Sequence, residues 1–256
     1  MRFRPCIDLH DGAVKQIVGA TLTDAGDAPR TNFTSPHPPS HYAALYRRDN
    51  LTGGHVIMLG PGNEAAAMDA LAAWPDGMQL GGGVTAENAG LWLARGASHV
   101  IVTSWIFHDG RVDMERLAAM SRLVGKERLV LDLSCRFRHD AYYVVTDRWQ
   151  RFTDFRLEAE TLAMLAAHCD EFLIHAVDVE GTCAGLDARL LALLADICPI
   201  PATYAGGIAT MADVDLVERV GRGKIDCTVG SALDIFGGHG IKYAELAARS
   251  GGASAR

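Results

Sequence analysis

Short apolar runs that alternate with longer amphipathic segments constrain the fold of this chain more than any other feature. Eight runs have the length and the β-branched or leucine-rich character of buried strands. They are FRPCIDL (3–9), HVIMLG (55–60), MQLGG (78–82), HVIVTS (99–104), RLVLDLS (128–134), EFLIHAVD (171–178), IPATYAGG (200–207) and KIDCTVG (224–230). The pattern predicts an α/β fold with a parallel sheet closed as a (β/α)8 TIM barrel. A doubly wound open sheet is the competing arrangement.

A helix is expected after each strand. The helical segments are 41–49, 63–74, 85–95, 113–123, 157–168, 187–196, 210–220 and 239–249. Asn63, Thr85 and Thr210 stand at their expected N-caps. The 256 residues match one barrel of roughly 250 residues, so we expect a single domain over 1–256.

Two segments fall outside this alternation. Residues 19–39 are rich in Gly, Thr and Pro and predict a long loop after the first strand, of the kind that forms a lid. Residues 141–152 (AYYVVTDRWQRF) alternate like a small hairpin after the fifth strand. Both would lie over the carboxyl ends of the strands, where barrels of this type place their active sites.

Charge and composition indicate which binding partners and cellular settings are not expected for this protein. The net charge of −7 provides no basic field, so nucleic acid is not an expected partner. No apolar run reaches the roughly 18 residues of a membrane span, and the N-terminal residues lack a signal-peptide pattern, so we expect a cytoplasmic enzyme. Six cysteines without any CxxC pair argue against a zinc ribbon or a disulfide scaffold.

The chain also repeats itself weakly. Three pairs of motifs recur: CIDL (6–9) with VLDL (130–133), GGGVT (81–85) with AGGIAT (205–210), and VTSWIF (102–107) with VGSALDIF (229–236). The first two pairs share an offset of 124 residues, and the third differs from it by only three. We interpret the repeat as two half-barrels of four strands, each with a similar ligand-binding device.

Each device resembles a phosphate cradle. In both halves one strand ends in Gly-Gly and the next ends in a serine, so backbone N–H groups and a hydroxyl can converge on one anion without a lysine. A single Gly-Gly at a strand end is more often a simple tight turn. Two of them at matching positions predict a small-molecule ligand with two phosphates, held by its two ends.

Two repeated aspartates lie between these devices. Asp8 and Asp132 end strands 1 and 5, which face each other across an eight-stranded barrel. One carboxylate can take a proton from carbon while the other gives a proton to oxygen, provided that their pKa values are pushed apart. The alternative is that each aspartate only caps a loop.

The motifs together resemble one enzyme family. CIDLHDG (6–12), QLGGG (79–83), VTSW (102–105), LDLSC (131–135), HAVDVEGT (175–182), YAGGI (204–208) and VGSALDIFGG (229–238) are similar to the eukaryote-type branch of the phosphoribosylformimino-5-aminoimidazole carboxamide ribotide isomerases. Those enzymes catalyse the fourth step of histidine biosynthesis. The resemblance implies an Amadori rearrangement of a bisphosphorylated aminoaldose to an aminoketose, with no cofactor and no metal. We expect a monomer.

The resemblance also implies roles for individual residues. Asp8 matches the general base of the family and Asp132 the general acid, whose pKa would have to be raised. Trp149 matches a tryptophan that stacks on the substrate, although a rim aromatic is an equal alternative. The positions that match the phosphate sites are Gly82, Gly83, Ser104, Gly206, Gly207, Gly230 and Ser231.

The sequence departs from the bacterial pattern at three positions. His175 stands where that pattern has a threonine, Gln16 where it has an arginine, and Met58 where it has an aspartate on the second strand. His175 could bind the substrate, orient Asp132, or be a buried structural histidine. Bacterial relatives include enzymes that also accept phosphoribosylanthranilate, and the sequence does not decide whether this chain does.

Two rival functions remain open. The cyclase subunit of imidazole glycerol phosphate synthase is also a duplicated half-barrel with two aspartates, but it tends to carry a lysine base soon after its first strand. Here Lys15 follows CIDLH, but it does not stand at the position of that lysine relative to the first strand. A non-catalytic phosphate-binding barrel would keep the glycines and serines, yet it has no reason to keep both aspartates.

Overall fold

A closed ring of parallel strands forms the centre of the protein, whose computed structural model describes residues 1–18, 30–147 and 149–251. In ring order, the parallel strands of the described chain are β1 (Cys6–His10), β4 (Gly54–Met58), β5 (Met78–Gly81), β6 (Val100–Val102), β9 (Leu129–Asp132), β13 (Glu171–His175), β14 (Ala202–Ala205) and β15 (Ile225–Cys227). Phe3 bridges to Cys227 in parallel, and Arg4 N donates to Cys227 O at 2.8 Å, which closes the ring. The (β/α)8 barrel is confirmed, and the open doubly wound sheet is ruled out.

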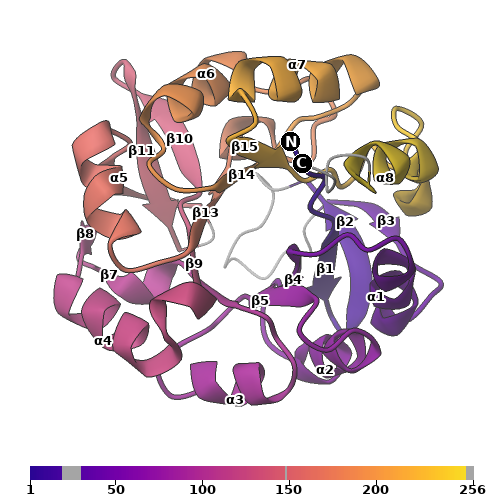
Figure 1. Ribbon diagram of the computed structural model, residues 1–256, viewed down its shortest axis with the longest axis horizontal. Helices are drawn as coiled ribbons and strands as arrows, with labels where there is room; N and C mark the ends of the chain where they lie inside the picture. Colours follow the sequence, from indigo (N-terminus) through magenta and orange to yellow (C-terminus); the bar gives the residue numbers. More distant parts are fainter. Residues whose placement is uncertain (19–29, 148, 252–256) are drawn as a thin grey trace.

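Helices surround this ring, and Figure 1 shows the chain passing once around the barrel. They are α1 (Pro39–Arg48), α2 (Glu64–Ala73), α3 (Ala89–Ala94), α4 (Met114–Val124), α5 (Ala159–Ala166), α6 (Ala188–Ile197), α7 (Met211–Gly221) and α8 (Tyr243–Gly251). None of the helices in the described ranges has both the length and the apolar character needed to cross a bilayer.

The positions at which the helices begin show which of the three expected N-cap residues are correct. Asn63 and Thr210 do occupy N-cap positions, and Thr210 forms a capping box with Asp213. Thr85 does not, because α3 begins four residues later than expected, with Asn88 at its N-cap. The Asn88 side chain accepts a hydrogen bond from Thr85 N at 2.9 Å, and this turn replaces the first part of the predicted helix.

The segment expected to be one long loop contains a strand. Residues 31–34 form β3 (Thr31–Thr34), which pairs antiparallel with β2 (Ala13–Ile17) and extends the barrel sheet beyond β1. Phe33 from β3 packs against Phe236 with ring centroids 6.0 Å apart, which anchors the strand. The prediction of an irregular loop was therefore wrong for these residues. Residues 19–29 of the expected lid lie outside the described part of the chain.

The expected hairpin after the fifth strand is present and is larger than predicted. β10 (Cys135–Arg138), β11 (Ala141–Thr146) and β12 (Arg151–Arg156) form an antiparallel sheet. A second, shorter antiparallel pair, β7 (Phe107–His108) and β8 (Arg111–Val112), follows β6. Val145 and Thr146 of β11 border the cavity described below, so the hairpin lies at the carboxyl ends of the barrel strands.

Buried charges close the opposite end of the barrel. Arg4 Nη2 donates to Glu171 at 3.1 Å and Arg4 Nε donates to Asp226 at 2.9 Å, while Gln79 donates to Glu171. All four residues are almost completely buried. The network satisfies each buried charge with a partner from another part of the chain, and it fills this end of the barrel with protein groups.

Candidate active site

A cavity of about 670 Å³ opens at the carboxyl ends of the barrel strands. Every residue that the sequence singled out for catalysis or ligand binding lines it: Asp8, Gly82, Gly83, Ser104, Asp132, Trp149, His175, Gly206, Gly207, Gly230 and Ser231. These positions come from seven barrel strands and the loops after them, so residues far apart in the sequence meet only because the ring is closed. A cavity of this size suits a small organic ligand.

Asp8 stands near the end of β1 on one side of this cavity. Gln16, from β2, donates from Nε2 to Asp8 Oδ2 at 3.0 Å. Burial raises the pKa of Asp8 above its ordinary value, although His175 and the hydrogen bonds from Gln16 and Cys6 oppose this effect. A carboxylate with a raised pKa is a stronger base once it is ionised, which suits a group that removes a proton from carbon.

Asp132 ends β9, four strands away from β1 around the ring. Its Oδ1 accepts a hydrogen bond from Ser134 Oγ at 2.8 Å and lies 3.2 Å from His175 Nδ1. Burial acts to raise the pKa of Asp132, but the charge and hydrogen bond of His175 outweigh burial and the pKa is lowered. This is the reverse of the expected order, in which Asp132 would have the raised pKa and Asp8 would stay ionised.

His175 ends β13 and explains that reversal. Burial alone would lower the pKa of His175, yet Asp132, Glu180 and Asp8 raise it to about 9. The indole of Trp149 lies over one side of the ring, with centroids 6.1 Å apart. The His55 ring meets the His175 ring edge-on, with centroids 6.4 Å apart. His175 therefore lies against a carboxylate in a cluster that favours its protonated form, rather than being a buried structural histidine.

The first expected phosphate device follows β5 and β6. Gly82 and Gly83 have φ values of +92° and +74°, a region that favours glycine. A Cβ on Gly82 would meet the Met58 carbonyl oxygen at 2.1 Å, so the backbone packs closely there. Ser104 begins a short 3-10 turn directly after β6 and is exposed to the cavity. The loop thus presents backbone and hydroxyl groups together.

The second device repeats this arrangement after β14 and β15. Gly206 and Gly207 have φ values of +115° and +74°, so the conformations of the two glycine pairs match. A Cβ on Gly207 would meet Gly185 O at 2.3 Å. Ser231 Oγ donates to Gln16 Oε1 at 3.4 Å and accepts from Asn32 Nδ2 at 3.2 Å. Gln16 therefore links the second device to Asp8.

The cavity has few groups that can carry positive charge. Among the lining residues that the structure describes, none is a lysine or an arginine. His55 does not supply a charge, because burial and then His175 lower its pKa to about 3. His175 is the remaining described side chain in the lining that can be a cation near neutral pH. An anionic ligand in this cavity must depend on backbone N–H groups, hydroxyls and His175.

Sequence reasoning missed or left open three contributors to the cavity: Gln16, His55 and Glu180. Gln16 was noted only as a departure from a pattern. Glu180, in the turn after β13, has a buried Oε2 without a hydrogen-bond partner in the described structure, and burial raises its pKa. The sequence signal for Glu180 was the Glu-Gly-Thr turn at 180–182. In the structure Gly181 of this turn has a φ of +70°, and a Cβ there would lie 2.4 Å from Ile17 O. For His55 the strand pattern gave no signal.

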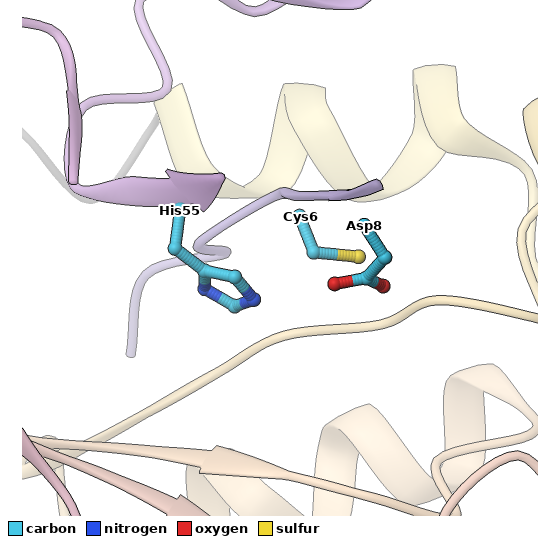
Figure 2. Close-up of side chains that lie close together, drawn as sticks. All are labelled: Cys6, Asp8 and His55. Atoms are coloured by element: carbon cyan, nitrogen blue, oxygen red, sulfur yellow. The ribbon is translucent and has the colours of Figure 1, made fainter. Parts of the chain in front are cut away.

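Within the described part of the chain, one cluster has the residue types of a metal site. The ligand atoms of Cys6, Asp8 and His55 all lie within 4.8 Å of one another. Figure 2 shows the Cys6 sulfur turned toward the Asp8 carboxylate, with His55 on the other side of Cys6. The register that pairs Cys6 with His55 brings them together, and burial raises the pKa of the Cys6 thiol well above its ordinary value. A thiol in that state is a poor metal ligand because the thiolate is the form that binds.

We expect catalysis by this site to need no metal. Treatment with a chelator followed by removal of the chelate should leave the turnover rate unchanged, because the residues present can move protons without an ion. The measurement is the initial rate before and after chelation, with each divalent ion then added back separately. Loss of all activity on chelation, with recovery on adding one particular ion, would contradict this expectation.

Comparison with known proteins gives a consistent result. The family model described as "Histidine biosynthesis protein" matches residues 2–238. A protein of Medicago truncatula is 52% identical over 254 residues, covering 97% of this chain and 81% of that protein. Its name is 1-(5-phosphoribosyl)-5-((5-phosphoribosylamino)methylideneamino)imidazole-4-carboxamide isomerase, chloroplastic.

Two fungal proteins carry the same isomerase name without the chloroplast designation. The Neurospora crassa protein is 51% identical over 247 residues, covering 95% of this chain and 96% of its own length. The Saccharomyces cerevisiae protein is 47% identical over 249 residues, covering 94% of this chain and 95% of its own length. The similarity thus extends over nearly the whole of each chain, including both halves of the barrel.

Proposed function

Because the chain belongs to the histidine biosynthesis protein family, we propose that it is the isomerase that converts the aminoaldose N-(5-phosphoribosylformimino)-5-aminoimidazole-4-carboxamide ribonucleotide to its aminoketose. One observation carries the proposal. Asp8 and Asp132 stand on opposite strands of one cavity, and that cavity also contains both glycine-and-serine devices. An elongated substrate with a phosphate at each end fits this arrangement.

Binding would begin at the two devices. Each phosphate would accept hydrogen bonds from backbone N–H groups after Gly-Gly and from one serine, Ser104 or Ser231. Both devices follow rigid barrel strands, so the distance between them is fixed. Holding the two ends would place the reacting ribose between Asp8 and Asp132, and positioning of this kind supplies a large part of many rate enhancements.

The chemistry needs two proton transfers at the reacting sugar. The ribose ring opens when its oxygen is protonated, and C2 of the resulting imine then loses a proton. We assign the removal of the C2 proton to Asp8, whose raised pKa makes it an effective base. We assign the protonation of the ring oxygen to the opposite side of the cavity, where Asp132 and His175 form a pair.

The rival functions have less support. The relatives described above are all named as isomerases, which favours isomerisation over the cyclase reaction. A non-catalytic phosphate-binding barrel would require no opposed carboxylates, yet both line this cavity, and the pKa of Asp8 is raised while that of Asp132 is lowered. Shifted pKa values of this kind are typical of functional sites.

Direct turnover tests the proposal. A coupled spectrophotometric assay with the aminoaldose should show isomerisation by the protein alone, and a parallel assay with phosphoribosylanthranilate would measure its substrate range. Turnover of the aminoketose only, and only with a source of ammonia, would instead identify a cyclase. A folded protein that binds the aminoaldose and turns over neither substrate would be a non-catalytic barrel.

A further inference from the structure

We infer that His175, rather than Asp132, is the residue that donates the proton to the ribose ring oxygen, and that Asp132 is the positioning residue that holds His175 for this step. The inference deepens the proposed isomerase function and rests on it. It reassigns the acid from the residue that the family resemblance indicates to its neighbour on the next strand of the ring, β13.

The contacts of His175 orient its ring. Nδ1 lies 3.2 Å from Asp132 Oδ1, and Ser134 donates to that same oxygen at 2.8 Å. Because the serine fixes the carboxylate and the carboxylate fixes Nδ1, the ring has one defined direction. The opposite nitrogen, Nε2, is then the one that can serve a ligand in the cavity that His175 lines. Trp149, on one side of the ring, belongs to the same lining.

The charges around His175 favour its protonated form. Carboxyl groups face it from three elements: Asp132 on β9, Asp8 on β1 and Glu180 in the turn after η4 (Val177–Val179). His55 on β4 faces it as well, but the low pKa of His55 keeps that ring neutral. With three carboxyl groups and one neutral histidine around it, the imidazolium is stabilised, and a ligand with two phosphates would add to this effect.

Asp132 is poorly placed to supply the proton itself. Its lowered pKa keeps it ionised, and Oδ1 already faces two hydrogen-bonding partners. An ionised carboxylate accepts protons and has none to give. A histidine cation held by a carboxylate is a common general acid, in which the carboxylate orients the ring and stabilises its charge.

The proton balance closes over one turnover. His175 Nε2–H protonates the ring oxygen as the C1–O bond breaks, and the nitrogen lone pair on C1 forms the C=N bond. Asp8 takes the C2 proton, and the C2–H electron pair forms the C=C bond of a neutral enolamine. The C2 hydroxyl proton then returns to the neutral imidazole of His175, and protonated Asp8 delivers its proton to C1. The ketone forms and both residues regain their starting states.

A titration of the unmodified protein tests where the proton resides. With isotope-labelled histidine, the His175 ring signal, assigned by its loss in His175→Gln, should titrate with a pKa of about 9. In Asp132→Asn the same signal should titrate at a clearly lower pH, because the main charge that stabilises the imidazolium is gone. A His175 ring that is neutral at pH values near 7 in the unmodified protein, or one that Asp132→Asn does not shift, would overturn the inference.

The pH dependence of kcat/KM tests the catalytic role. The unmodified enzyme should lose activity as the pH rises through about 9, where His175 loses its proton. His175→Gln should lower kcat by at least about 10²-fold and abolish this alkaline decline. His99→Asn is the matched control, since His99 forms a histidine–aspartate pair with Asp170 at 3.5 Å outside the cavity. It should keep both the rate and the decline.

The two hypotheses fail in different ways. If the unmodified protein turns over the aminoaldose, while His175→Gln is active and keeps its alkaline decline, only the assignment to His175 is wrong. If the unmodified protein gives no turnover at any pH, the proposed isomerase function is wrong. The ring titration does not depend on turnover, so it reports the protonation of His175 in either case.

Discussion

Asp8→Asn should lower kcat by at least about 10²-fold while the protein still binds inorganic phosphate or sulfate. The side chain keeps its size, and Gln16 can still form a hydrogen bond with it, but an amide cannot take the C2 proton. Steady-state kinetics of the purified variant give the measurement. In the unmodified enzyme, kcat/KM should also fall toward acid pH, as the Asp8 carboxylate becomes protonated at a pH set by its raised pKa.

A control separates this effect from a general loss of negative charge. Asp154 lies on β12, is exposed, and forms an ion pair with exposed Arg111. Asp154→Asn removes the same charge outside the cavity lining and should keep near-normal kcat. Near-normal kcat in Asp8→Asn as well would mean that Asp8 is structural, and the acid/base mechanism would have to be abandoned.

Gly82→Ala should remove anion binding at the first device and raise KM by at least about tenfold. The new Cβ would lie 2.1 Å from the Met58 carbonyl oxygen, at a φ of +92° that side chains rarely adopt. The strain alone costs about 1 to 3 kcal/mol, so the backbone must move and its N–H groups with it. In crystals soaked in sulfate, density should vanish near Ser104 and persist near Ser231.

Gly90→Ala provides the matched control for that substitution. Gly90 lies in α3, and a Cβ there would meet no other atom within 4 Å. Alanine should stabilise the helix by roughly 0.5 to 1 kcal/mol and leave KM unchanged. Sulfate at both devices in Gly82→Ala would mean that the close packing of Gly82 has no role in binding. Sulfate at neither device in the unmodified protein would contradict the half-barrel interpretation.

The barrel could be predicted because its signals are local and repeated. Eight apolar runs and their intervening helices each carry their own periodicity, and the glycine pairs mark where two strands end. The β3 strand could not be predicted in this way. Thr31 and its neighbours have no apolar alternation, and they pair with β2 because tertiary contacts such as Phe33 with Phe236 hold them there.

The candidate residues were also recognisable, but their protonation states were not. The repeat indicated that Asp8 and Asp132 would stand opposite each other, because strand order alone determines it. The order of their pKa values depends on His175, which lies 43 positions after Asp132 in the sequence yet 3.2 Å away in space. No pattern in the sequence shows that contact, and this single pair is enough to reverse the expected order of the two pKa values.

The closure of the barrel by the first residues of the chain has a consequence for synthesis. Arg2 bonds to Asp226, 224 positions away, and the buried Arg4 takes its partners from positions 167 and 222 residues further on. While the chain is being made, the residues just before β1 have no β15 strand to pair with and the Arg4 charge has no buried partner. The ring can close only after almost the whole chain has emerged from the ribosome, so an open sheet edge must stay free of wrong pairings until then.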